Sequence, residues 1–200
     1  MTETQARVQS DRQLVEATLC DRKAYAMIVV RYKHDLGRYV RRLLGRQFQA
    51  TEDVLQDVFI KAYINLNDYD TSRPFSPWIY RIAHNEAISF LRKRKTEPFI
   101  IAGQDAQLIL DRIAGDDDPA ASWMKRRTDV EIQRALETLD PRYRNVLVLR
   151  FLEEQSYDEI ADILQLPPGT VATYINRGLK QLKVPLKDSR ESLRTGPNND

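Results

Sequence analysis

Apolar residues recur at steps of three and four along much of this chain, which is the spacing of the buried face of an α-helix. In the N-terminal half this spacing predicts helices over residues 10–19 and 21–45. Gly45 ends the second of them. Its apolar stripe consists of Ala24, Ile28, Tyr32, Leu36, Tyr39, Val40, Leu43 and Leu44.

A third helix is predicted from about Thr51, with acidic residues in its first turn, where carboxylates suit the helix dipole. Its expected core face is Val54, Leu55, Val58, Phe59, Ala62, Tyr63 and Leu66. The other side carries Asp53, Gln56, Asp57 and Ile60. An exposed acidic strip is usually only a solvated face. The apolar Ile60 on the same strip weakens this interpretation slightly and leaves a surface that binds another protein as the alternative.

A polar loop over residues 67–76 leads into a fourth helix that runs to about Lys95. Ser76 is the expected N-cap, and Pro77 suits the first helical position, where its missing N–H costs nothing. The predicted buried stripe is Trp78, Ile79, Ile82, Ala83 and Leu91. The opposite side carries Arg81, Asn85 and Arg92 within a narrow arc. Four consecutive cations end the helix, namely Arg92, Lys93, Arg94 and Lys95.

Charge separates the chain into unlike parts, although its net charge is only +2. Residues 1–95 carry 17 Lys and Arg against 11 Asp and Glu, a net charge of +6. Residues 96–127 and residues 128–200 each have a net charge of −2. A positive field beside an acidic strip indicates one surface for nucleic acid and another for protein in the N-terminal domain.

Residues 96–127 break the helical pattern with prolines, glycines and the run Asp116–Asp118. This is the composition of a linker, with at most a short helix over residues 106–113. Two explanations of its acidity remain open, namely solubility and mimicry of nucleic acid beside the basic domain.

A second helical domain is predicted over residues 128–184, with helices over 130–138, 141–152, 157–164 and 168–183. Ser156 and Glu159 have the spacing of a capping box, and Asp140 before Pro141 has the pattern of an N-cap. The last two helices face each other across a short turn, which predicts a helix-turn-helix.

The predicted fold is therefore all-α, with two small helical domains, residues 1–95 and 128–184, joined by an extended acidic linker over 96–127. The polar residues 185–200 lack an apolar face and are expected to be disordered.

Composition excludes several classes of function. The single cysteine, Cys20, excludes an intramolecular disulfide and a thiolate zinc site, and it indicates a cytoplasmic protein. No apolar run reaches the roughly 18 residues of a membrane span, so no membrane insertion is expected. His34 and His84 have no catalytic or metal-binding constellation around them. We therefore expect neither a metal, nor a cofactor, nor enzymatic activity.

Two blocks carry a more specific signal. The first is ATEDVLQDVFIKAY followed by FSPWIYRIAHNEAISFLRKRK, and the second is ALETLDPRYRNVLVLRFLEEQSYDEIADILQLPPGTVATYINRGLKQL. They resemble, in this order, regions 2 and 4 of the sigma-70 family of bacterial transcription initiation factors. The resemblance covers roughly residues 24–95 and 130–183 and is to the smallest, two-domain group, the extracytoplasmic-function (ECF) sigma factors.

The resemblance implies a factor that binds core RNA polymerase, directs it to promoters with −35 and −10 elements, and helps to melt the −10 DNA. The acidic strip would dock on the clamp helices of polymerase through Asp53, Gln56 and Asp57. Region 4 would bind the polymerase flap and place its last helix in the major groove. An anti-sigma protein is a further partner that the resemblance implies.

The resemblance also assigns DNA contacts. The expected −10 contacts are Asn67, Asp70, Phe75, Trp78, Arg81, Asn85, Arg92, Lys93 and Arg94. The expected −35 contacts are Thr170, Thr173, Tyr174, Arg177 and Lys180. After the GTV motif the family commonly has a basic residue, a Ser and an Arg, where this chain has Ala172, Thr173 and Tyr174. Fewer cations there predict weaker phosphate contact by region 4 alone.

Two other classes of function are alternatives. A stand-alone helix-turn-helix repressor or activator would share the C-terminal motif, and stoichiometric binding to core polymerase separates it from a sigma factor. An enzyme acting on nucleic acid is a more distant alternative, because the catalytic constellation it needs is missing from the sequence.

Overall fold

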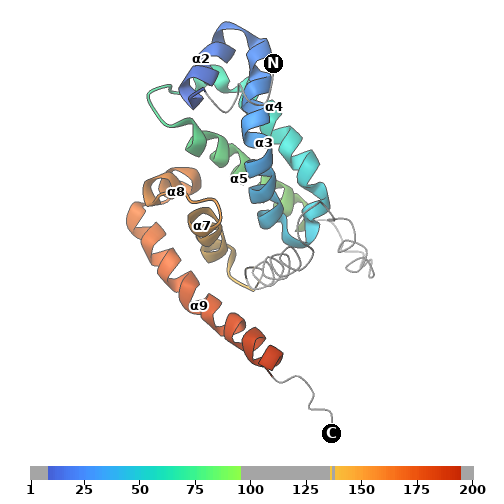
Figure 1. The fold of residues 1–200 in the computed structure, drawn as a ribbon, viewed down its shortest axis with the longest axis vertical. Helices are drawn as coiled ribbons and strands as arrows, with labels where there is room; N and C mark the ends of the chain where they lie inside the picture. The colour runs from blue at the N-terminus through green and yellow to red at the C-terminus, as the bar shows by residue number, and fades with distance from the viewer. Residues whose placement is uncertain (1–8, 96–135, 137, 195–200) are drawn as a thin grey trace.

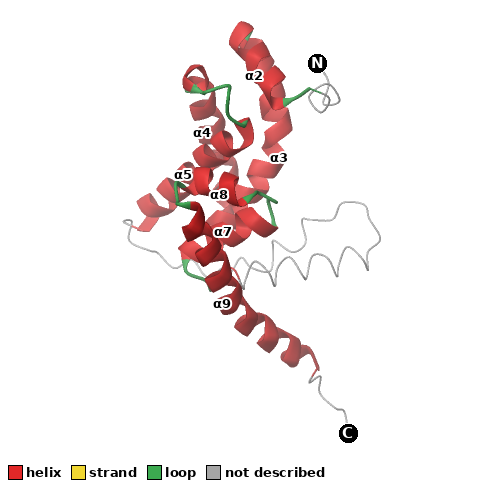
Figure 2. Ribbon diagram, turned by 90° about the vertical axis from the view of Figure 1, so that its left-hand side faces the viewer, coloured by secondary structure: helices red, strands yellow, loops and turns green. Residues whose placement is uncertain are grey.

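The computed structural model describes residues 9–95, 136 and 138–194, and every regular element in them is a helix (Figures 1 and 2). The N-terminal domain contains α2 (Asp11–Cys20), η1 (Arg22–Ala24), α3 (Tyr25–Leu44), η2 (Gly45–Ala50), α4 (Thr51–Ile64), η3 (Leu66–Asp68) and α5 (Phe75–Lys95). The C-terminal domain contains α7 (Pro141–Phe151), α8 (Tyr157–Leu164) and α9 (Pro168–Arg194).

Helix α3 is the centre of the N-terminal domain and packs against α2, α4 and α5. Its buried stripe contains the predicted residues from Ile28 to Leu44 and adds Met27, which gives eight buried residues in α3. Tyr39 lies in the middle of this core and is the largest side chain with no exposed area. Hydrophobic burial along α3 thus fixes the relative positions of α4 and α5, which carry most of the candidate site residues.

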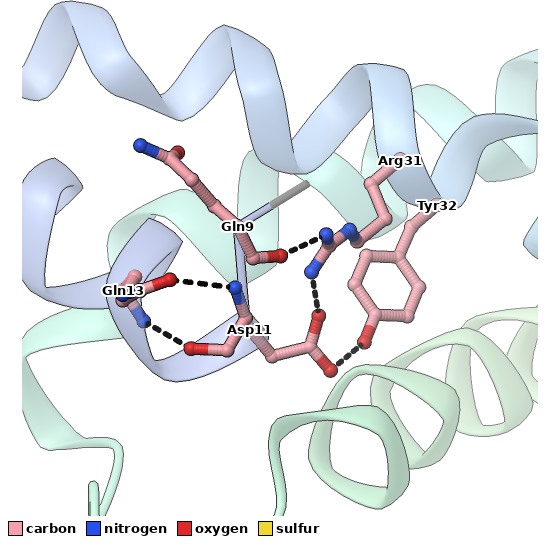
Figure 3. Close-up of polar contacts among 6 residues, drawn as sticks. Gln9, Asp11, Gln13, Arg31 and Tyr32 are labelled. Atoms are coloured by element: carbon pink, nitrogen blue, oxygen red, sulfur yellow. Dashed lines mark hydrogen bonds and ion pairs between the residues drawn. The ribbon is translucent and has the colours of Figure 1, made fainter. Parts of the chain in front are cut away.

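Helix α2 is held on α3 by a polar cluster (Figure 3). Ser10 and Gln13 form a capping box at its first turn. The Asp11 carboxylate accepts a hydrogen bond of 2.7 Å from the Tyr32 hydroxyl and pairs with the Arg31 guanidinium at 2.5 Å. Leu14 and Val15 of α2 are fully buried. The N-terminal helix is therefore an integral part of the domain.

The C-terminal domain is built from local signals that the sequence shows. Asp140 caps α7, where its side chain accepts from the backbone N–H of Arg142, and Ser156 with Glu159 forms the expected capping box of α8. The turn between α8 and α9 places Gln165 in the left-handed conformation, with φ of 53°. Val171 of α9 is fully buried. The predicted helix-turn-helix is confirmed.

Three details differ from the sequence prediction. Helix α5 begins at Phe75, so Ser76 lies inside its first turn and is not the N-cap. Tyr63 was expected in the core, but its side chain is 38% exposed. Helix α9 continues to Arg194, past Lys183, where the sequence pattern ends it. Residues 96–127, the helix expected over 106–113 and most of the helix expected over 130–138 lie outside the described residues.

The two domains are in contact. Helix α8 packs along α5, and α7 touches α3 (Figure 1). Beyond this contact α9 extends away from the other helices. In the described part of the chain no helix is both long and apolar enough to cross a membrane.

Candidate functional site

The acidic strip on α4 is exposed as predicted. Asp53, Gln56 and Asp57 are all exposed, and Ile60 on the same strip is 49% exposed. At about 100° of rotation per residue these four side chains share an arc of roughly 100°. The strip is therefore one continuous surface with two carboxylates at the N-terminal end and an aliphatic side chain near the other.

The structure extends this surface by a residue that the sequence pattern missed. Ile64 is 65% exposed and lies one further turn along the strip from Ile60. Beside it, the ring of Tyr63 packs edge-on against Tyr25 at 5.0 Å and under the Arg22 guanidinium at 5.0 Å. Exposed aliphatic side chains on one face are typical of a protein-binding surface. Ile64 could have been predicted from the sequence, because it lies four residues after Ile60 and therefore on the same helix face.

An aromatic cluster joins the loop after η3 to the start of α5. Phe75 lies at its centre, 5.3 Å from Tyr69, 5.3 Å from Trp78 and 5.6 Å from Tyr32 between ring centroids. Phe75 is only 3% exposed, whereas Trp78 is half-buried. Among the expected DNA contacts, Phe75 is thus a buried neighbour of the Trp78 ring, and Trp78 itself stays partly exposed.

Polar contacts hold the loop between α4 and α5 in one conformation. The Asn67 side-chain oxygen accepts a hydrogen bond of 2.9 Å from Arg22, a residue that the sequence analysis did not single out. Asp70 accepts hydrogen bonds from the backbone N–H and the hydroxyl of Ser72, at 2.9 and 2.7 Å. These hydrogen bonds lower the pKa of Asp70 below its ordinary value. The loop therefore presents a charged carboxylate and an oriented amide at neutral pH.

One side of α5 carries three of the remaining expected −10 contacts, namely Arg81, Asn85 and Arg92. Counted at about 100° per residue, Trp78, Arg81, Asn85 and Arg92 lie within roughly 60° of one another. Trp78 packs against the core and is half-buried, as the predicted stripe requires, and its position around the helix also borders the arc of Arg81. Arg92, Lys93 and Arg94 are exposed at the end of α5, where the Arg94 guanidinium lies 5.2 Å from the centre of the Phe90 ring.

The start of α9 carries the expected −35 contacts on one side. Thr173, Arg177 and Lys180 are exposed, while Thr170 and Tyr174 are half-buried. The Thr173 hydroxyl donates to the backbone carbonyl of Gly169 at 2.8 Å, and Tyr174 packs edge-on against Tyr143 at 5.5 Å. These side chains share an arc of roughly 120°. This surface is suited to the major groove of DNA. It carries few cations that could contact the phosphates.

One carboxylate from the C-terminal domain is buried against the N-terminal domain. The side chain of Glu153 is 1% exposed, forms an ion pair with Arg42 and accepts a hydrogen bond of 3.1 Å from the Tyr80 hydroxyl. Burial raises the pKa of Glu153 above its ordinary value, while Arg42 and Tyr80 act in the opposite direction. Nearby, Arg81 pairs with Asp162 of α8 at 3.2 Å.

A histidine lies beside this contact. The Nδ1 atom of His84 is 3.0 Å from the Tyr39 hydroxyl, and burial lowers the pKa of His84 to about 4. His84 is therefore neutral at pH 7, and its Nδ1 atom has the Tyr39 hydroxyl as a polar partner.

Comparison with known proteins gives two family matches. Residues 28–97 match the model of "Sigma-70 region 2", and residues 129–182 match the model of "Sigma-70, region 4". The two matches stand in the order that the sequence blocks suggest.

Curated relatives and a solved structure agree with these matches. The ECF RNA polymerase sigma factor SigW of Bacillus subtilis (strain 168) is 37% identical over 175 residues, which cover 84% of this chain and 91% of that protein. The ECF RNA polymerase sigma-E factor of Escherichia coli (strain K12) is 32% identical over 168 residues, covering 78% and 83%. CnrH, solved in complex with the cytosolic domain of CnrY, has a TM-score of 0.66 at 26% identity and covers 90% of this chain and 99% of CnrH.

Proposed function

This chain belongs to the sigma-70 family, as an ECF sigma factor. From this premise we propose that three separate surfaces of the protein bind three different partners during transcription initiation. As a sigma factor, the protein acts with core RNA polymerase in promoter-specific initiation. It is an initiation factor and not a catalyst, and its place of action is the cytoplasm, where polymerase works. The proposal concerns which residues serve which partner.

The acidic strip of α4 binds the clamp helices of core polymerase. Asp53, Gln56 and Asp57 supply charge and hydrogen bonding, and the exposed Ile60 and Ile64 supply apolar area beside them. Charged side chains at a protein interface mainly set specificity and association rate, whereas desolvated apolar side chains supply much of the affinity. The exposure of both kinds of side chain on one helix face is the observation that carries this assignment.

The open side of α5 and the loop before it bind the −10 element as a single strand. Melted bases need a surface on which to stack, and a base stacked on an aromatic ring gains ~1–3 kcal/mol. Trp78 is the half-buried ring on this side, and Arg81, Asn85 and Arg92 follow it along the helix. The sequence has no ATP-binding loop, so capture of melted bases by such contacts supplies the free energy of opening, together with polymerase.

The exposed side of α9 reads the −35 element as a duplex. Thr173 and Arg177 are exposed near the start of the helix, where a recognition helix meets base edges. Few cations lie on this side, and the C-terminal part of the chain has a net negative charge. Stable −35 binding therefore depends on polymerase, which holds region 4 against the DNA.

Run-off transcription tests the proposal. Core polymerase from the source bacterium is incubated with its fragmented genome, with and without this protein, and the 5′ ends of the RNA are mapped. We expect discrete new start sites that share two upstream elements. Absence of both new starts and core binding would favour the stand-alone helix-turn-helix regulator instead.

A matched pair of variants tests the acidic strip. Asp53→Asn with Asp57→Asn is expected to weaken binding to core polymerase about tenfold, ~1.4 kcal/mol. Glu16→Gln with Glu52→Gln removes two charges from the same domain outside the strip and is the control. Equal core binding by both double variants, measured by fluorescence anisotropy, would remove the strip from the interface.

A further inference from the structure

A shielded line of contacts connects helix α2 to Trp78. One oxygen of the Asp11 carboxylate accepts a hydrogen bond of 2.7 Å from the Tyr32 hydroxyl. The Tyr32 ring packs edge-on against Phe75 at 5.6 Å, and Phe75 lies 5.3 Å from Trp78 between ring centroids. Tyr32 is 7% exposed and Phe75 is 3% exposed. We call Asp11, Tyr32 and Phe75 the strut, because they join α2 to the proposed stacking ring through the interior of the domain.

The Asp11 end of the strut is held by both of its oxygens. The second carboxylate oxygen pairs with the Arg31 guanidinium at 2.5 Å, and the same guanidinium donates to the backbone carbonyl of Gln9 (Figure 3). Ser10 and Gln13 close the first turn of α2 through their capping box. The Asp11 carboxylate therefore cannot turn without losing an ion pair or a hydrogen bond.

The Tyr32 hydroxyl depends on this carboxylate. Burial, and next the hydrogen bond to Asp11, raise the pKa of Tyr32, so the hydroxyl keeps its proton and is the donor. A buried hydroxyl that loses its partner is destabilising, because it has already been removed from water. The hydrogen bond thus fixes the outer end of the Tyr32 ring, and with it the angle of 68° at which this ring meets Phe75.

Phe75 connects this fixed ring to Trp78. Phe75 is the first residue of α5, and Trp78 follows about one turn later. The Tyr69 ring closes the group from the loop, at 5.3 Å from Phe75 and 5.2 Å from Trp78. Close-packed rings leave little free volume, so a shift of one ring moves its neighbours. A change at Asp11 is therefore expected to reach Trp78, which is the half-buried ring of this group.

The strut begins outside the parts of the chain that match the family models. The match to region 2 starts at residue 28, whereas α2 spans Asp11–Cys20. The family matches therefore assign no role to Asp11, and its contacts are specific information from the structure of this chain.

We propose that Asp11 is a positioning residue for −10 recognition: acting through Tyr32 and Phe75, it holds the Trp78 ring in the orientation in which a melted base stacks on it. The inference rests on the proposed stacking role of Trp78. A ring that is already held in its bound orientation loses less freedom on binding than a mobile ring. A residue that acts at a distance from the stacked base thus contributes to the affinity.

Two substitutions remove the two ends of the hydrogen bond. Asp11→Ala removes the acceptor, and Tyr32→Phe removes the donor while it keeps the ring against Phe75. The probe is a fluorescent non-template oligonucleotide that carries the −10 element of a mapped promoter, bound to the polymerase holoenzyme. Each variant is expected to weaken its binding about fivefold, the value of one hydrogen bond of ~1 kcal/mol. Arg12→Ala breaks an exposed ion pair on the same helix and is the control, with wild-type affinity expected.

Combined variants test whether the effect passes along the strut. Asp11→Ala with Tyr32→Phe is expected to lose no more affinity than either single variant, because both break the same bond. In a Trp78→Ala background, Asp11→Ala is expected to have no further effect. Additive losses in either combination would overturn the inference.

Binding to core polymerase separates positioning from a general loss of stability. Asp11→Ala and Tyr32→Phe are expected to bind core polymerase as the wild type does, and circular dichroism checks that both fold. A loss of core binding that parallels the loss of −10 binding would overturn the positioning role.

The fluorescence of Trp78 reports on the ring directly. The sequence has two tryptophans, Trp78 and Trp123, so Trp123→Phe leaves Trp78 as the only one. In this background Asp11→Ala and Tyr32→Phe are expected to increase the quenching of Trp78 by acrylamide in the free protein, whereas Arg12→Ala is expected to leave it unchanged. Equal quenching in all of these proteins would overturn the link between Asp11 and the ring.

Two results distinguish the inference from the proposed function. Loss of −10 binding in Trp78→Ala but not in Asp11→Ala would overturn the role of the strut and keep the stacking role. Wild-type −10 binding in both variants would refute the stacking role of Trp78, and with it the positioning role of Asp11.

Discussion

At the scale of single residues, the surroundings of Trp78 are consistent with the proposed stacking role. Its ring contacts Phe75 at 5.3 Å and Tyr69 at 5.2 Å between ring centroids, and it is half-buried. A ring held by neighbours loses little rotational freedom when a base stacks on it, so more of the stacking energy contributes to binding.

Trp78→Ala is therefore expected to weaken binding of the single-stranded −10 oligonucleotide to the polymerase holoenzyme about 5- to 150-fold, ~1–3 kcal/mol. Trp78→Phe keeps an aromatic face and is expected to retain most of the affinity. Fluorescence anisotropy measures both, and a thermal melt checks folding. Equal affinities for the Ala variant and the wild type would show that Trp78 packs in the core and does not contribute to DNA binding.

His84 links the stability of region 2 to pH. Burial lowers its pKa from an ordinary value of 6.5 to about 4. Between these two values the unfolded chain binds a proton that the folded chain does not bind, so the free energy of unfolding falls as pH falls from 6.5 towards 4. At pH 5 this amounts to ~2 kcal/mol at ~1.36 kcal/mol per unit. Its nearest titratable neighbour is Tyr39, which burial keeps protonated.

Urea denaturation at pH 7 and pH 5 tests this linkage. In His84→Gln the loss of stability between the two pH values is expected to be ~2 kcal/mol smaller than in the wild type. His34→Gln, which changes an exposed histidine, is the control for the substitution itself. The linkage is absent if all three proteins lose the same stability on acidification.

At the scale of elements, the close approach of α7 and α9 depends on a glycine. A Cβ atom at Gly178 would lie 2.9 Å from Cδ1 of Leu147 and 3.2 Å from Cβ of Tyr143. Leu147 is only 3% exposed, so it has little room to move aside. The glycine thus sets the distance between the recognition helix and the helix that supports it.

Gly178→Ala is expected to destabilise region 4 by ~1 kcal/mol. The change improves helix propensity by up to ~1 kcal/mol, but overpacking a buried contact costs ~1–3 kcal/mol and outweighs it. Gly169→Ala is the control, because nothing lies within 4 Å of a Cβ atom there. Urea denaturation measures both, and a Gly178→Ala variant as stable as the wild type would show that α7 and α9 can separate at no cost.

Elements with one buried face could be predicted well from the sequence. The stripe of α3, the acidic strip of α4 and the capping box of α8 follow from spacing, since side chains three and four apart share a face. The sequence predictions were wrong where tertiary contacts outweigh local sequence preferences. Phe75 begins α5 because its ring packs into the aromatic cluster, and Tyr63 leaves the core because it packs sideways on Tyr25.

At the scale of the whole molecule, the contact between the domains has no sequence signal. Arg42 and Glu153 are 111 positions apart, and no pattern in the sequence pairs them. A glutamate in the loop between two helices is normally predicted to be exposed, because charged groups are rarely buried unless they are paired. The family resemblance gave the two domains and their order, but the direction in which Glu153 points depends on a turn that only the structure shows.

The pairing of Arg81 with Asp162 has a consequence for genetics. Substitution of Arg81 removes its ion pair with Asp162 as well as any contact that the side chain makes with the promoter, so the phenotype of an Arg81 variant combines two effects. Substitution of Asp162 removes the ion pair alone. A screen that includes both positions therefore separates the part of Arg81 in the contact between the domains from its part in transcription.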